Sequence, residues 1–157
     1  MRTVGIVCEY NPFHNGHLNH MQLAAAQPDG EFVVCVMSSD FLQRGEPAVL
    51  PKNLRAQSAV LNGADLVFEI PSVFSCSSAE FYATAAVQMM GRLGIVDSIV
   101  FGSENNDIDL LKQIASLLVD EPDDYKIVLK KHLASGVSFA KARALAIAEY
   151  LGNDGVP

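Results

Sequence analysis

Two of the four histidines in the chain stand three residues apart, shortly after an apolar run at the N-terminus. The stretch is GIVCEYNPFHNGH, from Gly5 to His17. Side chains three residues apart share one side of a helix's first turn, so His14 and His17 can face one ligand. Two hydrogen-bond donors beside the free N–H groups of a helix start can stabilise charge on a phosphate oxygen. The pattern favours nucleotidyl transfer, with pyrophosphate leaving.

The loop before these histidines is predicted to be stiff. Asn11 precedes a proline and is biased toward an extended backbone, while Pro12 fixes its own φ. Gly16 lacks a side chain at the expected helix start, so a flat ligand or a phosphate can approach the backbone there. The segment contains no G-x-x-x-x-G-K-[ST] motif, which argues against a P-loop NTPase.

Two alternatives to phosphate binding remain open for the histidines. A histidine at a helix start can serve only as a cap or a surface residue. His14, His17 and His20 are also a possible metal site. However, successive steps of three turn by about 300°, which spreads the rings over about 120° of the helix surface. Such directions converge poorly on one ion, so we predict that these three histidines do not form a metal site. His132 is expected to be solvated.

The composition indicates a globular protein. The 157 residues are 50% hydrophobic, with a mean hydropathy of +0.21, enough for one packed core. No apolar run approaches the roughly 20 residues of a membrane span, and the N-terminus lacks the layout of a signal peptide. Cys8, Cys35 and Cys76 form no C-x-x-C pair and are expected to be reduced. We therefore expect a cytoplasmic protein without a membrane partner.

The net charge of −7 disfavours a broad nucleic-acid surface, so an RNA partner needs a local basic patch. Arg44, Lys52 and Arg55 are candidates for such an edge, facing triphosphate or RNA; the alternative for Lys52 and Arg55 is an ordinary solvated helix face. Asp40 either positions a water or magnesium ion or caps a turn. Phe74, in the loop after the third strand, either lines an acetate pocket or packs in the core.

Short apolar segments alternate with helical patterns, which predicts an α/β protein with a doubly wound, Rossmann-like parallel sheet. The predicted strands are Thr3–Cys8, Phe32–Met37, Asp65–Ile70 and Ser98–Phe101, and the helices between them are His17–Ala26, Lys52–Asn62 and Ala79–Leu93. Ser77 with Glu80 is expected to form a capping box, and Gly63 and Gly94 to end helices. In such sheets ligands bind beyond the carboxyl ends of the strands.

The pattern becomes entirely helical toward the C-terminus. Helices are predicted over Ile108–Val119, Asp123–Ala134 and Phe139–Leu151. We therefore divide the chain into an α/β core, residues 1–105, and a helical extension, residues 106–157. The last residues, Gly152–Pro157, have the composition of a linker, so we expect a chain truncated before further C-terminal residues.

Several motifs now support a family resemblance. The element His14-Asn-Gly-His17 resembles the signature of the HIGH-motif nucleotidyltransferases. The longer string EYNPFHNGH, followed by MSSDFLQRGEPAV and FGSEN, resembles the bacterial tRNA(Met) cytidine acetate ligase family. This similarity is strongest over residues 4–47 and 65–105. Family members continue beyond this length, with an asparagine-containing element, an arginine and a C-terminal region expected to hold tRNA.

The resemblance implies an ATP-dependent ligase. It would activate acetate to acetyl-adenylate and transfer the acetyl group to N4 of the wobble cytidine in elongator tRNA(Met). It implies catalytic roles for His14 and His17, and ATP, with magnesium, as the nucleotide. The implied ATP-binding residues are Val7, Cys8, Glu9, Tyr10, Asn11, Pro12, Phe13, His14, Asn15, Gly16, His17, Leu18, Asn19, His20 and Gly102.

Two other functions stay open. The same H-x-G-H architecture serves small-molecule adenylyltransferases of cofactor biosynthesis, which would use a phosphorylated precursor instead of acetate. The third possibility is an acidic nucleotide-binding or protein-interaction module without turnover.

Overall fold

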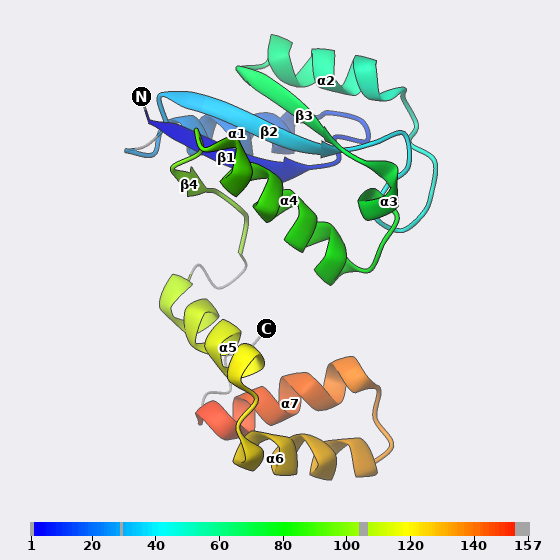
Figure 1. Cartoon of the computed structure of the whole chain (residues 1–157), viewed down its shortest axis with the longest axis vertical. Helices are drawn as coiled ribbons and strands as arrows, with labels where there is room; N and C mark the ends of the chain where they lie inside the picture. The colour runs from blue at the N-terminus through cyan, green and yellow to red at the C-terminus, as the bar shows by residue number, and fades with distance from the viewer. Residues whose placement is uncertain (1, 29, 104–106, 153–157) are drawn as a thin grey trace. The chain divides into compact units, whose positions relative to one another are not determined.

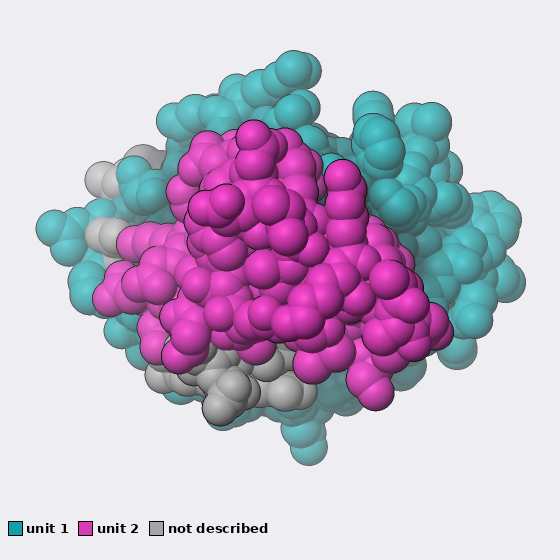
Figure 2. Space-filling model, turned by 90° about the horizontal axis from the view of Figure 1, so that it is seen from below, with its two compact units in different colours: residues 1–101 teal, residues 102–157 magenta. Residues whose placement is uncertain are grey.

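The computed structural model describes residues 2–28, 30–103 and 107–152. They form two compact units, residues 1–101 and 102–157 (Figure 2, teal and magenta). The predicted boundary after residue 105 and the linker composition over residues 153–157 lie outside the described residues. In the described part of the chain, no helix has the length and hydropathy that crossing a membrane requires.

The first unit is built on a parallel sheet of four strands. These are β1 (Thr3–Cys8), β2 (Phe32–Ser38), β3 (Leu66–Ile70) and β4 (Ser98–Ile99), in the order β3-β2-β1-β4 (Figure 1). Gly5 of β1 pairs with Val34 of β2 on one side and with Ile99 of β4 on the other. The strand order reverses between β1 and β4, which is where doubly wound sheets bind ligands.

Helices cover both faces of this sheet. On one face α1 (Asn15–Ala25) and α2 (Lys52–Leu61) enclose a core with β1 and β2, in which Met21 and Ala59 are almost completely buried. On the other face α4 (Ala79–Leu93) supplies Met90 to a second cluster. The two-sided cover explains why the strand sequences are nearly continuous apolar runs. The predicted α/β, doubly wound class is confirmed.

Gly5 lets the α4 face approach the sheet closely. A Cβ atom at this position would lie 2.5 Å from the Met90 sulfur and 3.0 Å from a Val96 methyl carbon. Because packed interiors have no spare volume at that distance, a side chain here would force α4 away from β1.

Two aspartates secure the amino edge of the sheet in the same way. Asp97, just before β4, accepts a hydrogen bond from the Thr3 N–H at 2.7 Å, and its own N–H donates to the Thr3 carbonyl at 2.9 Å. Asp65, just before β3, exchanges the same two bonds with Val33, at 2.8 and 2.9 Å. These pairs satisfy backbone groups at the strand starts and fix the strand register.

The elements differ from the predicted ones in a few places. Helix α1 starts at Asn15, not His17, and α4 is capped by Ser78, whose Oγ accepts from the Phe81 N–H, not by Ser77. Strand β4 is shorter than predicted, and the short helix α3 (Ser72–Ser75) was expected to be a loop. Gly63 and Gly94 do adopt positive φ, as predicted for helix ends.

The second unit consists of α5 (Ile108–Asp120), α6 (Asp123–Ala134) and α7 (Phe139–Leu151), close to the predicted bounds. Its core gathers Leu117, Tyr125, Ala146 and Ile147. His132 bonds to Glu149 at 2.8 Å and is therefore paired, not simply solvated.

The close approach at Gly5 yields a stability prediction. Gly5→Ala should lower the free energy of unfolding by about 1 to 3 kcal/mol, because the added methyl meets Met90. Gly91→Ala is the matched control, since a Cβ there meets nothing within 4 Å and alanine is the better helix former, by about 1 kcal/mol. Urea unfolding followed by circular dichroism measures both. Equal effects of the two substitutions would contradict the packing argument.

Candidate functional site

His14 forms the N-cap of α1. Its backbone is extended, and its Nδ1 accepts a hydrogen bond from the Gly16 N–H at 3.0 Å. An accepting Nδ1 carries no proton in the neutral ring, so the Nε2 holds it and is left as a donor. His14 therefore does act as a helix cap, one of the alternatives left open by the sequence. The cap orients the imidazole through Nδ1 and leaves the Nε2 N–H free to donate.

Gly16 is required for this geometry. A Cβ atom at Gly16 would lie 2.9 Å from His14 Cε1 and 3.1 Å from Nδ1. The space that we expected a ligand to use over Gly16 is therefore taken by the imidazole of His14.

The two histidine rings are brought together. His14 and His17 stack with ring centroids 3.7 Å apart and planes inclined by 25°. The Tyr10 ring contacts the His17 ring edge-on, with the ring centroids 5.0 Å apart, and the centroid of the Phe13 ring lies 5.7 Å from that of His17. His17 is thus held from three sides, while the His14 ring is exposed.

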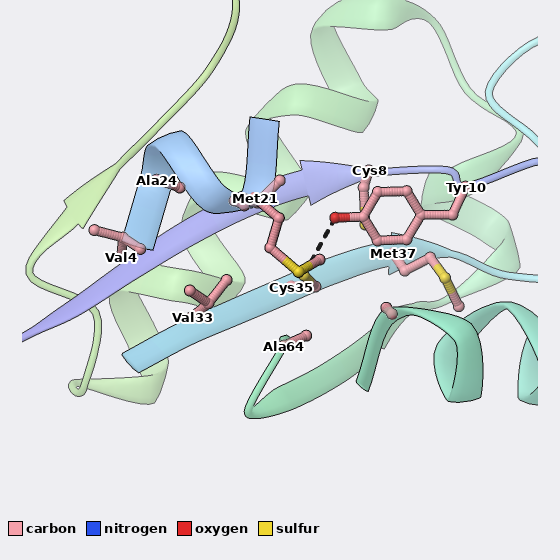
Figure 3. Packing of buried hydrophobic residues seen from close by; sticks show 11 residues of the cluster. Val4, Cys8, Tyr10, Met21, Ala24, Val33, Cys35, Met37 and Ala64 are labelled. Carbon is pink, nitrogen blue, oxygen red and sulfur yellow. Dashed lines mark hydrogen bonds between the residues drawn. The ribbon is translucent and has the colours of Figure 1, made fainter. Parts of the chain in front are cut away.

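Tyr10 anchors this group in the core. The residue is 2% exposed, and its hydroxyl lies 3.5 Å from the Cys35 sulfur in β2 (Figure 3). Its backbone has a φ of 48°, unusual for a non-glycine residue, which turns the chain out of β1 toward α1. Burial raises the pKa of Tyr10 far above its ordinary value, so the hydroxyl stays protonated.

The two thiols beneath Tyr10, Cys8 and Cys35, have pKa values shifted in opposite directions. Burial raises the pKa of Cys8, while a hydrogen bond from Cys8 and another from Tyr10 lower the pKa of Cys35. Both thiols are buried, and their reduced state stays a prediction.

A cavity of about 540 Å³ opens at the carboxyl end of β1. Two ring nitrogens of its wall, His17 Nδ1 and His20 Nε2, are buried and lack a hydrogen-bond partner. The cavity is lined by Ile6, Val7, Cys8, Glu9, Tyr10, Asn11, Pro12, His14, His17, His20, Leu42 and Tyr82. Unsatisfied buried nitrogens are costly, so a ligand that bonds to them would stabilise this wall.

His17 resists protonation. Its burial, and then the nearby rings of His14 and His20, lower the pKa of His17 from its ordinary value. A neutral His17 can stack on His14 at neutral pH without like-charge repulsion.

The sequence-predicted site residues fall into three groups. Those in the cavity wall are Val7, Cys8, Glu9, Tyr10, Asn11, Pro12, His14, His17 and His20, whereas Phe13, Asn15, Gly16, Leu18 and Asn19 lie outside it. Phe13 supports His17 from behind. Gly102 is exposed and belongs to the second unit, so its contact with adenosine stays a prediction.

Ile6, Leu42 and Tyr82 line the cavity but were not predicted. Leu42 lies in the tight turn after β2, where its N–H donates to the Glu46 carbonyl at 2.8 Å. Tyr82, in the first turn of α4, donates to the Cys8 carbonyl at 3.1 Å. The one sequence signal for Leu42 is the position of its turn directly after the predicted second strand, at the carboxyl edge of a parallel sheet.

The predicted basic edge is wrong for Arg55 and unsupported for Lys52. Arg55 is completely buried and bonds to carbonyl oxygens. Lys52 pairs with Glu69 at 2.7 Å, and its backbone N–H donates to Asp40 at 3.0 Å. Asp40 therefore binds the start of α2 from the loop after β2, a contact that differs from the turn cap predicted for it.

The third loop does not reach the cavity. Phe74 is 43% exposed and lies instead in a separate apolar groove of about 400 Å³ along α4, with Phe81 and Met89. Ser75, in α3, is buried and donates to the Phe41 carbonyl at 2.8 Å, so this segment braces the loop after β2.

Among the residues that the structure describes, no group of three or more histidine, cysteine, aspartate or glutamate side chains could hold a metal ion. The trio of His14, His17 and His20 is therefore not such a group.

Comparison with known proteins gives the same family. A family model described as HIGH Nucleotidyl Transferase matches residues 1–156. The chain belongs to the HIGH nucleotidyltransferase family. Within it, the chain is 52% identical over 147 residues to the tRNA(Met) cytidine acetate ligase of Caldicellulosiruptor bescii, and 47% over 150 residues to that of Alkaliphilus metalliredigens.

These matches cover 94% and 96% of this chain but 36% and 35% of the two relatives, so the chain spans about a third of their length. A solved structure is similar too: the crystal structure of Thermotoga maritima TmcAL bound with alpha-thio ATP has a TM-score of 0.90 at 43% identity. That alignment covers 97% of this chain and 37% of the solved one. The resemblance expected from the sequence is confirmed.

The environment of His17 predicts a titration. Nuclear magnetic resonance should give its pKa below the ordinary value of about 6.5. Because the unfolded chain then binds the proton first as the pH falls, the free energy of unfolding should decrease from about pH 7 to pH 5. His14→Ala should raise the pKa of His17 by removing one ring that covers and repels it. A pKa at or above the ordinary value in the unsubstituted protein would contradict this description.

Proposed function

We propose that this chain carries the ATP site of a tRNA(Met) cytidine acetate ligase. In this proposal the protein activates acetate with ATP to acetyl-adenylate and transfers the acetyl group to N4 of the wobble cytidine in elongator tRNA(Met). Relatives with this name match nearly the whole chain, and a similar solved structure holds an ATP analogue. We assign the reaction to the cytoplasm, where tRNA is modified.

The observation that carries the proposal is the stacked pair of His14 and His17 at the wall of a cavity. The pair stands at the start of α1, where free N–H groups and the helix dipole favour an anion. The orphaned nitrogens of His17 and His20 offer further hydrogen bonds there. The cavity size, about 540 Å³, falls within the range of small-molecule sites.

ATP supplies the leaving group of the first step. An oxygen of acetate attacks the α-phosphorus, and the bond from that phosphorus to the bridging oxygen breaks, so that pyrophosphate leaves with the electron pair. His14 donates from Nε2, the position that its cap leaves protonated, to the phosphate oxygens on which charge accumulates. No covalent bond to the protein forms.

The second step joins the acetyl group to the base. The N4 amine of cytidine attacks the acetyl carbonyl carbon, the bond to the phosphate oxygen breaks, AMP leaves, and the amine loses one proton. The residues that hold tRNA(Met) are proposed to lie in the part of the relatives that this chain does not match.

Magnesium normally accompanies ATP, and oxygen ligands suit it. Among the described residues of the cavity wall, Glu9 carries the carboxylate, and one of its oxygens accepts from the Gln43 N–H at 2.8 Å. We assign to Glu9 the remaining oxygen as a ligand, because Asp40, the carboxylate we expected from the sequence, is bound to Lys52.

Pyrophosphate exchange tests the proposal. With the full-length enzyme, labelled pyrophosphate should enter ATP only when acetate is present, and His17→Ala should lower the exchange rate by about 100-fold or more. His132→Ala is the control, since this residue pairs with Glu149 in the second unit, and it should leave exchange unchanged. Exchange that ignores acetate but requires a phosphorylated cofactor precursor would instead indicate a cofactor adenylyltransferase. ATP binding without any turnover would indicate a non-enzymatic module.

A further inference from the structure

Arg55 is the largest side chain that is fully buried in the first unit, and the catalytic scheme above does not use it. In the described part of the chain its guanidinium bonds to carbonyl and hydroxyl oxygens and to no carboxylate. A buried cation of this kind is expensive unless its donors are well satisfied. Its donors are satisfied, but its charge has no anionic partner among the described residues, and this remaining cost favours a role besides stability.

The oxygens that Arg55 contacts come from three separate segments. Its Nε donates to the Leu50 carbonyl at 3.1 Å, just before α2. One terminal nitrogen donates to the Glu9 carbonyl and to Ser38 Oγ, and the other to the carbonyls of Ser38 and Ser39. Glu9 follows β1, and Ser38 ends β2, so one side chain joins both loops at the carboxyl edge of the sheet.

The bond to Glu9 acts on the histidine pair through one residue. The Glu9 carbonyl belongs to the peptide unit that precedes Tyr10, whose φ of 48° directs the chain toward α1. The Tyr10 ring supports His17 at 5.0 Å. Holding this carbonyl therefore holds the turn that places His17.

The second loop is fastened to the same point. The Gln43 N–H donates to the Glu9 carboxylate at 2.8 Å, and the Val49 N–H donates to the Asn11 side-chain oxygen at 2.6 Å. Leu42, which lies between Ser39 and Gln43 in the sequence, lines the cavity. The loops after β1 and β2 are thus joined by the Arg55 fork and by these two further contacts.

We propose that Arg55 is a positioning residue for the phosphate site, which sets the distance between the loops after β1 and β2 and thereby the placement of His17. The proposal rests on the proposed function, because it assumes that these loops receive ATP. Lysine cannot replace it: an ammonium group offers three donors from one point, whereas the guanidinium offers five in a planar fork.

The test uses Arg55→Lys in the full-length enzyme. In the folded variant we expect the KM for ATP to rise by about 10- to 100-fold, as misplaced binding groups cause. We also expect the nuclear magnetic resonance titration of His17 to move toward its ordinary pKa, because Tyr10 no longer covers the ring. A purely structural arginine would lower thermal stability but leave the His17 titration of the folded molecules unchanged.

Lys52→Met is the matched control, on the same helix and one turn earlier. The Lys52 side chain is half-exposed and pairs with Glu69, so its loss should leave both the KM for ATP and the His17 titration unchanged. Where Arg55→Lys fails to fold, Ser38→Ala replaces it: this variant removes one acceptor of the fork and keeps the carbonyls, and it should move both readouts in the same direction, by a smaller amount.

The proposal is overturned if folded Arg55→Lys shows an unchanged KM for ATP and an unchanged His17 titration. Where Arg55→Lys does not fold, the same result for Ser38→Ala overturns it. This failure differs from failure of the proposed function. If labelled pyrophosphate enters ATP without acetate, the proposed function is wrong, whereas the dependence of the His17 titration on Arg55 is measured without nucleotide.

Discussion

The packing of Tyr10 beneath the first helix is the interaction on which the site depends. A strand that ends at the edge of a parallel sheet leaves its last side chains half in the core and half in solvent. Here the tyrosine ring goes inward, to the thiol of Cys35, and the backbone adopts a positive φ to allow it. The next turn must then run over the ring, which brings His17 against it. The core therefore places the imidazoles.

The electrostatics of the site are local. The chain carries a net charge of −7, and Arg55, which bonds to the carbonyl of the cavity-wall residue Glu9, is enclosed by carbonyl oxygens. An anionic ligand is then attracted by dipoles, namely the start of α1 and the N–H of an imidazole, more than by formal charges. Neutral donors of this kind need no desolvation of an ion when a ligand arrives, which suits a site whose ligand must also leave.

Much of the fold could be predicted from the sequence because its signals are local. Strands such as TVGIVC are continuous apolar runs, which occur when both faces are covered, and the order of elements then implies a parallel sheet. The histidine pair was visible because spacing on a helix is also a local property. Arg55 was not, since its acceptors are carbonyl oxygens at the ends of β1 and β2, which no pattern around residue 55 reveals. Leu42 and Tyr82 were missed for the same reason, as they come from separate segments that meet only in the folded chain.

The paired hydrogen bonds of Asp65 and Asp97 keep strand alignment separate from ligand binding in the sheet. They fasten neighbouring strands at the edge opposite the cavity, so strand alignment does not rely on the loops that surround it. Those loops can accept exchanged residues, or even altered lengths, while the strands keep their alignment. A scaffold of this kind is suited to divergence, because a different ligand can be accommodated by changes in the loops at one edge of the sheet while the opposite edge stays unchanged.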